Sequence, residues 1–103
     1  MKRELRSYHE KLIEELQDPE EAEAYLNQAL KDEDPRIFLL ALKNVHEAQG
    51  DQMTSLAKKT KLSRENLYRI LSSKGNPKLS SIISLLNAAG FSLAVQPNKK
   101  RNR

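Results

Sequence analysis

The sequence predicts an all-α protein of six helices, followed by one short β-strand near the C-terminus. Apolar residues recur at helical spacing in six segments, and a capping side chain precedes a proline three times. Gly50 and Gly90 each follow an apolar-periodic run, where a helix would stop. A chain of 103 residues is long enough for one small domain with a modest core.

The first three helices are expected at residues 4–16, 19–31 and 35–48. Each has apolar residues that return to one side of a helix, and the third is more broadly apolar. The second and third begin after an aspartate and a proline. An aspartate oxygen can accept from free amides of the first turn, and proline has no N–H to satisfy. The pairs are Asp18-Pro19 and Asp34-Pro35.

Three further helices are expected at residues 52–59, 64–73 and 77–89. Asp51 and Ser63 stand where the N-caps of the first two would lie. Asn76 precedes a proline in the same way as the two aspartates, and so marks the start of the last helix.

A strand is expected at residues 91–96, because Phe91, Leu93 and Val95 recur with the period of two that is typical of a strand. An isolated strand leaves its backbone groups unpaired, so its simplest partner is the same strand of a second copy. These three residues are therefore candidates for a homodimer contact. The chain divides into an N-terminal helix extension at 1–17, a main domain at 18–97 and a basic tail at 98–103.

Composition excludes several classes of protein. Without cysteine the chain has no disulfide, thiolate nucleophile or zinc finger. No run of about 18 apolar residues could span a membrane, and the start lacks the apolar core of a secretory signal, so a reducing cytoplasm fits. His9 and His46 lie far apart without ligand-spaced partners, and three glycines do not form a phosphate-binding loop. We expect no enzyme activity, metal or cofactor.

The net charge of +4 hides a gradient along the chain. Residues 1–52 hold 7 Lys or Arg against 13 Asp or Glu, a balance of −6. Residues 53–103 hold 11 Lys or Arg against 1 Glu, a balance of +10. A basic half in a small domain indicates a polyanion partner, although a merely solvated surface is the alternative.

The segment TSLAKKTKLSRENLYRIL joins this positive charge to a regular apolar skeleton. Ala57, Leu62, Leu67 and Ile70 have the spacing of a helix-turn-helix. The small alanine lets the second helix approach, Leu62 fills the corner, and Leu67 with Ile70 forms the inner face. The place in the turn that is commonly glycine is Lys61, where a left-handed backbone would cost about 1 kcal/mol.

The outward face of the second helix carries Arg64, Glu65, Tyr68 and Arg69, which we expect to bind DNA. Such a helix can enter the major groove, where the two arginines are candidates to read guanine. Ser63 would cap the helix and could also meet a phosphate. The alternative for Arg69 is a surface ion pair with Glu65, worth about 0.2–0.5 kcal/mol, and the two roles are compatible.

Four segments of the chain resemble a known family: DPEEAEAYLNQAL, DPRIFLLALKNVHEAQG, LAKKTKLSRENLYRILSSKGNP and LLNAAGFSLAVQP. Over about residues 19–97 the sequence resembles the Cro/repressor-type helix-turn-helix proteins known as addiction-module antidote proteins, close to the antitoxins of host-inhibition-of-growth systems. The resemblance implies a bacterial protein with a lambda-repressor-like, five-helix DNA-binding core. It also implies a homodimer on a palindromic operator, autorepression, and a small ribonuclease toxin as cognate partner.

The resemblance also indicates phosphate contacts in the loop after the recognition helix and at the start of the next helix. Lys74, Asn76 and Lys78 occupy those places, although Asn76 could equally be a pure N-cap. The acidic N-terminal half could bind a basic toxin, or its first helix could simply extend the core. Two alternative functions remain: a stand-alone repressor, and a helical protein-interaction module without DNA binding.

Overall fold

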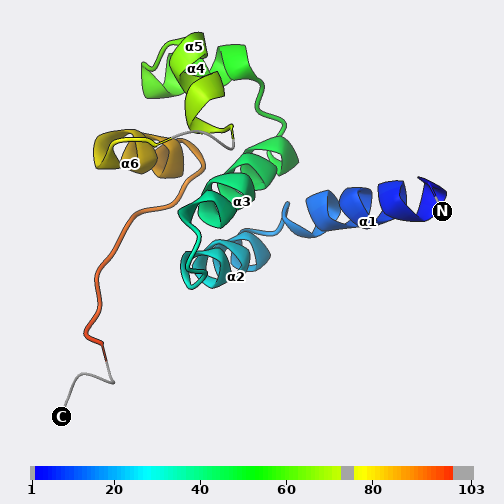
Figure 1. The fold of residues 1–103 in the computed structure, drawn as a ribbon. Helices are drawn as coiled ribbons and strands as arrows, with labels where there is room; N and C mark the ends of the chain where they lie inside the picture. The colour runs from blue at the N-terminus through cyan, green and yellow to red at the C-terminus, as the bar shows by residue number, and fades with distance from the viewer. Residues whose placement is uncertain (1, 73–75, 99–103) are drawn as a thin grey trace.

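The computed structural model describes residues 2–72 and 76–98, which form six α-helices and no strand. The helices are α1 (Lys2–Glu15), α2 (Pro19–Leu30), α3 (Pro35–Ala48), α4 (Met53–Thr60), α5 (Arg64–Ile70) and α6 (Leu79–Ala88). In Figure 1, α3 runs through the middle, with α1 and α2 packed against it, while α4 packs against α5 and α6. The predicted all-α class is confirmed.

Two of the proline-marked helix starts form as predicted. The Asp18 carboxylate accepts from the backbone N–H of Glu20 at 2.9 Å, and the Asp34 carboxylate accepts from that of Arg36 at 3.0 Å. A proline follows each cap, so no amide is left without an acceptor at that position. The side chain of Arg36 also donates to Asp34, and this hydrogen bond lowers the pKa of Asp34.

The helices α3 and α6 end as the two glycines predict. Gly50 follows α3 with φ of 80°, and Gly90 follows α6 with φ of 90°. A side chain is disfavoured in this left-handed conformation, which glycine adopts without steric cost.

Three predicted helix boundaries are wrong. The N-cap of α4 is Gln52, which forms a capping box with Ser55, and Asp51 lies one residue earlier with other partners. Helix α5 ends at Ile70 rather than at residue 73. Helix α6 starts at Leu79, because Lys78 has an extended backbone and its carbonyl accepts the first helical bonds.

The predicted strand at 91–96 is also wrong. After Gly90 the described chain continues to residue 98 without regular secondary structure. Residues 2–72 and 76–98 contain no strand, so within that part of the chain no partner is available to form a ladder. Phe91 is partly buried, but Leu93 is 43% and Val95 is 97% exposed, so the alternation does not mark one buried face.

The hydrophobic core joins residues from five helices. Leu42 and Val45 of α3, Leu67 of α5 and Leu85 of α6 are each 0% exposed. Burying a side chain of this size contributes about 1.5–3 kcal/mol. The inner side of α5 therefore belongs to the same core as α3, and this fixes which side of α5 faces solvent.

Candidate nucleic-acid interface

The short helices α4 and α5 pack against each other and are joined by residues 61–63. Of the side chains predicted to hold them together, Leu67 is 0% and Ile70 3% exposed, and Ala57 is partly buried against the core. Leu56 of α4, at 2% exposed, also lies on the inside. Leu62 is partly buried at the turn. The apolar skeleton of this segment therefore packs as its spacing predicted.

The turn has a left-handed backbone at Lys61, the position that is commonly glycine in a helix-turn-helix. Lys61 has φ of 63°, and its N–H donates to the carbonyl of Ala57 at 2.9 Å. The hydroxyl of the buried Thr60 donates to the carbonyl of Leu56 at 2.7 Å and accepts from the N–H of Leu62 at 3.2 Å. A threonine here is therefore a structural part of the turn, because its polar group is fully paired.

Ser63 is the N-cap of α5, as predicted. Its hydroxyl accepts from the backbone N–H of Asn66 at 3.0 Å, which satisfies a donor that the first turn leaves free. Ser63 is itself exposed, so its hydroxyl lies at the surface that α5 presents.

The four residues expected to read DNA lie together on the solvent side of α5. Arg64, Glu65, Tyr68 and Arg69 are all exposed, and Tyr68 is 54% exposed. Among the described residues, none of the ion pairs includes Arg64, Glu65 or Arg69. The surface pair of Glu65 with Arg69 does not form, so these charged groups are available to a ligand.

The structure describes two of the three residues that were expected to contact phosphates. Lys74 lies outside the described residues. Asn76 and Lys78 are exposed in the segment that leads into α6, and the N-cap of that helix is Lys78. The alternative reading of Asn76 as the N-cap is therefore wrong.

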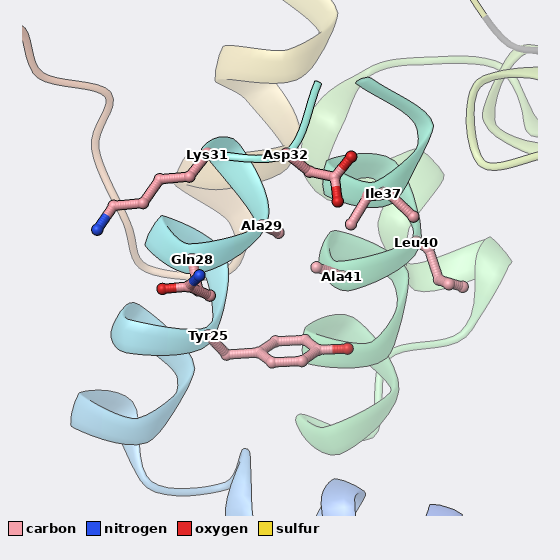
Figure 2. A pocket seen from close by; sticks show the side chains of 8 residues that line it. All are labelled: Tyr25, Gln28, Ala29, Lys31, Asp32, Ile37, Leu40 and Ala41. Atoms are coloured by element: carbon pink, nitrogen blue, oxygen red, sulfur yellow. The ribbon is translucent and has the colours of Figure 1, made fainter. Parts of the chain in front are cut away.

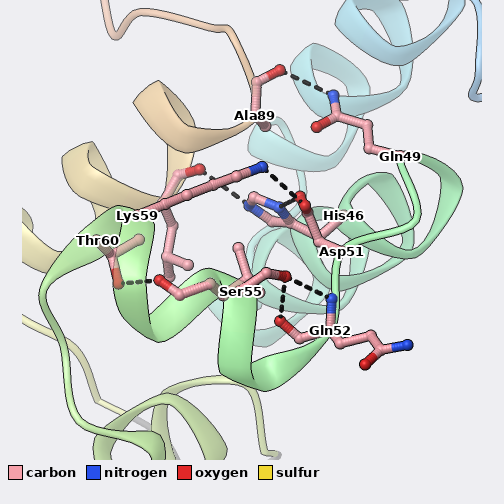
Figure 3. Close-up of polar contacts among 10 residues, drawn as sticks. His46, Gln49, Asp51, Gln52, Ser55, Lys59, Thr60 and Ala89 are labelled. Atoms are coloured by element: carbon pink, nitrogen blue, oxygen red, sulfur yellow. Dashed lines mark hydrogen bonds and ion pairs between the residues drawn. The ribbon is translucent and has the colours of Figure 1, made fainter.

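A buried polar cluster, which the sequence did not predict, fixes α4 against the core (Figure 3). The ring of His46 in α3 is 2% exposed. Its Nδ1 lies 2.9 Å from Oδ2 of Asp51, and its Nε2 lies 2.9 Å from the carbonyl oxygen of Leu85 in α6. Lys59 of α4 donates to Oδ1 of Asp51 at 2.8 Å. Three helices thus meet at one carboxylate and one imidazole.

The charges in this cluster follow from its geometry. Both ring nitrogens of His46 lie within hydrogen-bond distance of oxygens, one of the Asp51 carboxylate and one of the Leu85 carbonyl. Burial by itself would raise the pKa of Asp51, but hydrogen bonds from Lys59 and His46, together with their charges, lower it below its usual value. A signal was present in the sequence, since His46 lies four residues after Leu42, on the core side of α3.

A separate shallow hollow of about 360 Å³ lies between α2 and α3 (Figure 2). Tyr25 points from α2 toward α3, and its hydroxyl accepts from the side-chain amide of Asn44 at 2.9 Å. Ile37 and Leu40 line the hollow and are 40% and 52% exposed. The Tyr25 hydroxyl is already engaged in its bond with Asn44, and most of the other residues that line the hollow are apolar.

Within residues 2–72 and 76–98, no group of three or more His, Cys, Asp or Glu side chains could hold a metal ion. No helix in that part of the chain is long and apolar enough to cross a membrane.

Comparison with known proteins gives one family. A family model described as "Probable addiction module antidote protein" matches residues 7–97. An uncharacterized protein of Haemophilus influenzae is 31% identical over 88 residues, which cover 85% of this chain and 89% of that protein. No solved structure matches the chain.

Proposed function

Because the chain belongs to the "Probable addiction module antidote protein" family, we propose that it is a DNA-binding antitoxin of a bacterial toxin-antitoxin module. In this proposal it binds a palindromic operator in the cytoplasm, represses its own operon and neutralises a small toxin that cleaves RNA. Family membership supports a regulatory, non-enzymatic protein. The observation that carries the DNA-binding role is the solvent face of α5.

That face has the chemistry for reading base edges in the major groove. Arg64 and Arg69 would donate two hydrogen bonds each to guanine, and Glu65 would accept from the amino group of cytosine. Tyr68 adds an aromatic surface and a hydroxyl beside them. Since the inner side of α5 is fully buried, the helix presents these groups without first having to order itself, which favours affinity.

Positive charge around α5 supports a nucleic acid rather than a protein as the ligand of this face. Lys61 is exposed in the turn before α5, and Lys78 is exposed at the start of α6. The uncharged Ser63 and Asn76, also exposed, could donate hydrogen bonds to phosphate oxygens. The half of the chain after residue 52 has an excess of 10 positive charges, which would attract phosphates and make binding depend on salt.

The test compares Arg69→Ala and Lys78→Ala on two DNA duplexes of equal length, one from upstream of the operon and one of random sequence. Arg69→Ala is expected to cost about 1–3 kcal/mol on the operator and much less on random DNA. Lys78→Ala should weaken both alike and lower the slope of binding against salt by about one. Arg36→Ala is the control, because that arginine pairs with Asp34 at the start of α3. Equal losses for Arg69→Ala on both duplexes would contradict base reading.

We also propose that the protein acts as a homodimer without an intermolecular strand at 91–96. Support comes from exposed apolar side chains beside the C-terminal segment: Leu30 is 51%, Leu79 62% and Leu93 43% exposed. Leu30 and Leu93 line two hollows. The one of about 450 Å³ lies at the starts of α3 and α6, and the one of about 910 Å³ lies between α2 and the segment that follows α6. One seven-residue helix reads few base pairs, so a second copy would supply the other half-site.

Sedimentation at micromolar concentration tests the dimer. The intact chain should sediment as a dimer, and Leu93→Lys should sediment as a folded monomer with weakened operator binding. A monomeric intact chain that still binds the palindrome tightly would rule the dimer out.

A further inference from the structure

The core covers the C-terminal end of α1 and leaves Tyr8 exposed. Leu16, just after the helix, is 3% exposed, Leu12 and Ile13 are half-buried, and Tyr8 is 77% exposed. In Figure 1 the first turns of α1 extend away from the other helices. From Leu16 back to Tyr8, burial therefore decreases along α1.

One surface contact limits how α1 can move. Nε2 of His9 lies 3.2 Å from a carboxylate oxygen of Glu47 near the end of α3, and both side chains are about half exposed. An exposed pair of this kind contributes about 0–1 kcal/mol. The direction of α1 is thus set by Leu16, the half-buried residues and this pair, while Tyr8 remains unpartnered by the core.

The spacing of residues along α1 places an aromatic side chain beside an acid. Tyr8, Leu12 and Glu15 are four and three residues apart, so they follow one side of the helix. Tyr8 and Glu15 are exposed, and Leu12 is half-buried between them. A tyrosine with an apolar ring and a polar tip is typical of the residues that anchor protein interfaces.

The surrounding charge indicates the chemistry of what could bind there. Between residues 8 and 34 the chain has ten Asp or Glu and two Lys. Nine of the ten acids are exposed, and Asp34 is partly buried. The sequence before Tyr8 is basic, so the acidic surface begins at Glu10 and continues over α2. A basic protein would be steered to this surface by complementary charge.

We propose that the exposed face of α1 is the docking surface for a basic protein, the toxin of the module. Tyr8 is its anchor, Glu15 and Lys11 lie beside Tyr8, and Glu14 and Glu10 lie farther round the helix. This inference rests on the antidote role proposed above and adds the surface that performs it. Toxin binding would then use one end of the molecule and DNA the face of α5, so both ligands could be held at once. The apolar contact supplies most of the affinity, and the acids supply the association rate.

The experiment uses the full chain and the product of the adjacent reading frame whose expression alone stops growth. Binding of that purified protein is measured for Tyr8→Ala and Glu15→Arg. Tyr8→Ala should weaken it by at least about tenfold, mainly through faster dissociation. Glu15→Arg should slow association and reduce its dependence on salt.

Two matched variants separate the two surfaces. Tyr68→Ala removes the exposed tyrosine of α5 and should lose operator binding while toxin binding stays unchanged. Glu33→Arg reverses an exposed acid in the segment between α2 and α3, outside the face of α1, and should slow toxin association less than Glu15→Arg does. Thermal unfolding of each variant shows that it is folded.

The outcomes distinguish this inference from the function on which it rests. If the wild-type chain binds the toxin and Tyr8→Ala binds it equally well, the docking surface is wrong and the antidote role stands. The docking surface is also wrong, and the antidote role still stands, if the toxin carries a net negative charge. This conclusion applies as well if Tyr8→Ala breaks the homodimer and not the toxin complex. If the wild-type chain does not bind the toxin at all, both proposals are wrong.

Discussion

Helices α1 and α5 both present an exposed tyrosine, yet the protein supports them very differently. Helix α5 has 7 residues, and α1 has 14. The shorter helix is capped by Ser63 and buries Leu67 and Ile70. In the longer helix, among the residues whose side chains the structure describes, Leu12 and Ile13 are half-buried and none is fully buried. Burial and capping, rather than length, determine how firmly a helix presents its outer face.

This difference suits two kinds of recognition. Reading base edges needs side chains at fixed positions, because hydrogen bonds to bases depend on direction. A docking helix can tolerate some adjustment, because an aromatic anchor needs only a pocket that excludes water. The following substitutions test the comparison, from the largest expected effect to the smallest.

Replacing a buried leucine in each region measures the difference in support directly. Leu67→Ala should lower the free energy of unfolding by about 2–5 kcal/mol, because it leaves a cavity in the core. Leu12→Ala should cost less than half as much, because that side chain is already partly in solvent. Urea unfolding gives both values. Equal losses would show that α1 is supported as firmly as α5.

The His46–Asp51–Lys59 cluster gives a second difference, because it holds α4, against which α5 packs, and includes no residue of α1. Asp51→Ala leaves the buried Nδ1 of His46 without its hydrogen-bond partner and should cost about 1–3 kcal/mol at pH 7. The exposed Glu21→Ala is the control and should change stability by less than about 0.5 kcal/mol.

The same carboxylate gives a pH dependence of known sign. Its pKa in the folded protein is below the usual 3.8, so its contribution is present above about pH 4 and is lost as the pH falls through the folded value. Between pH 5 and pH 2 the free energy of unfolding should therefore fall more for the wild-type chain than for Asp51→Ala. Parallel curves would contradict this role for Asp51.

The smallest effect is expected at the turn between α4 and α5. Lys61→Gly should stabilise the protein by up to about 1 kcal/mol, because glycine adopts the positive φ of this position without strain. Lys58→Gly, in the interior of α4, should instead destabilise it by about 0.5–1 kcal/mol. If both substitutions destabilise the protein, the left-handed backbone of Lys61 is not strained.

Local features of the sequence predicted much of this fold. Asp18, Asp34 and Ser63 cap helices as expected, since a cap depends only on residues within the next turn. The inner positions of α5 were predicted because residues three and four apart share a helix face. The site residues on its outer face follow from the same spacing, and their binding to DNA remains a prediction.

The errors concern features that depend on distant residues. The side chain of Asp51 looked like a cap, but its partners His46 and Lys59 come from two different helices. The period of two at residues 91–96 resembles a strand, yet a strand exists only with a neighbour, and the described residues supply none. In both cases the pattern was local and the deciding contact was not.

Two adjacent residues at the end of α3 connect the two surfaces of the molecule. His46 points toward Asp51 and Leu85, and Glu47 contacts His9 of α1. One added residue after Val45 would rotate this turn by about 100°, because an α-helix has 3.6 residues per turn. The imidazole and the carboxylate would then both point away from their partners. A one-residue insertion at this position would therefore weaken the support of both α1 and α4.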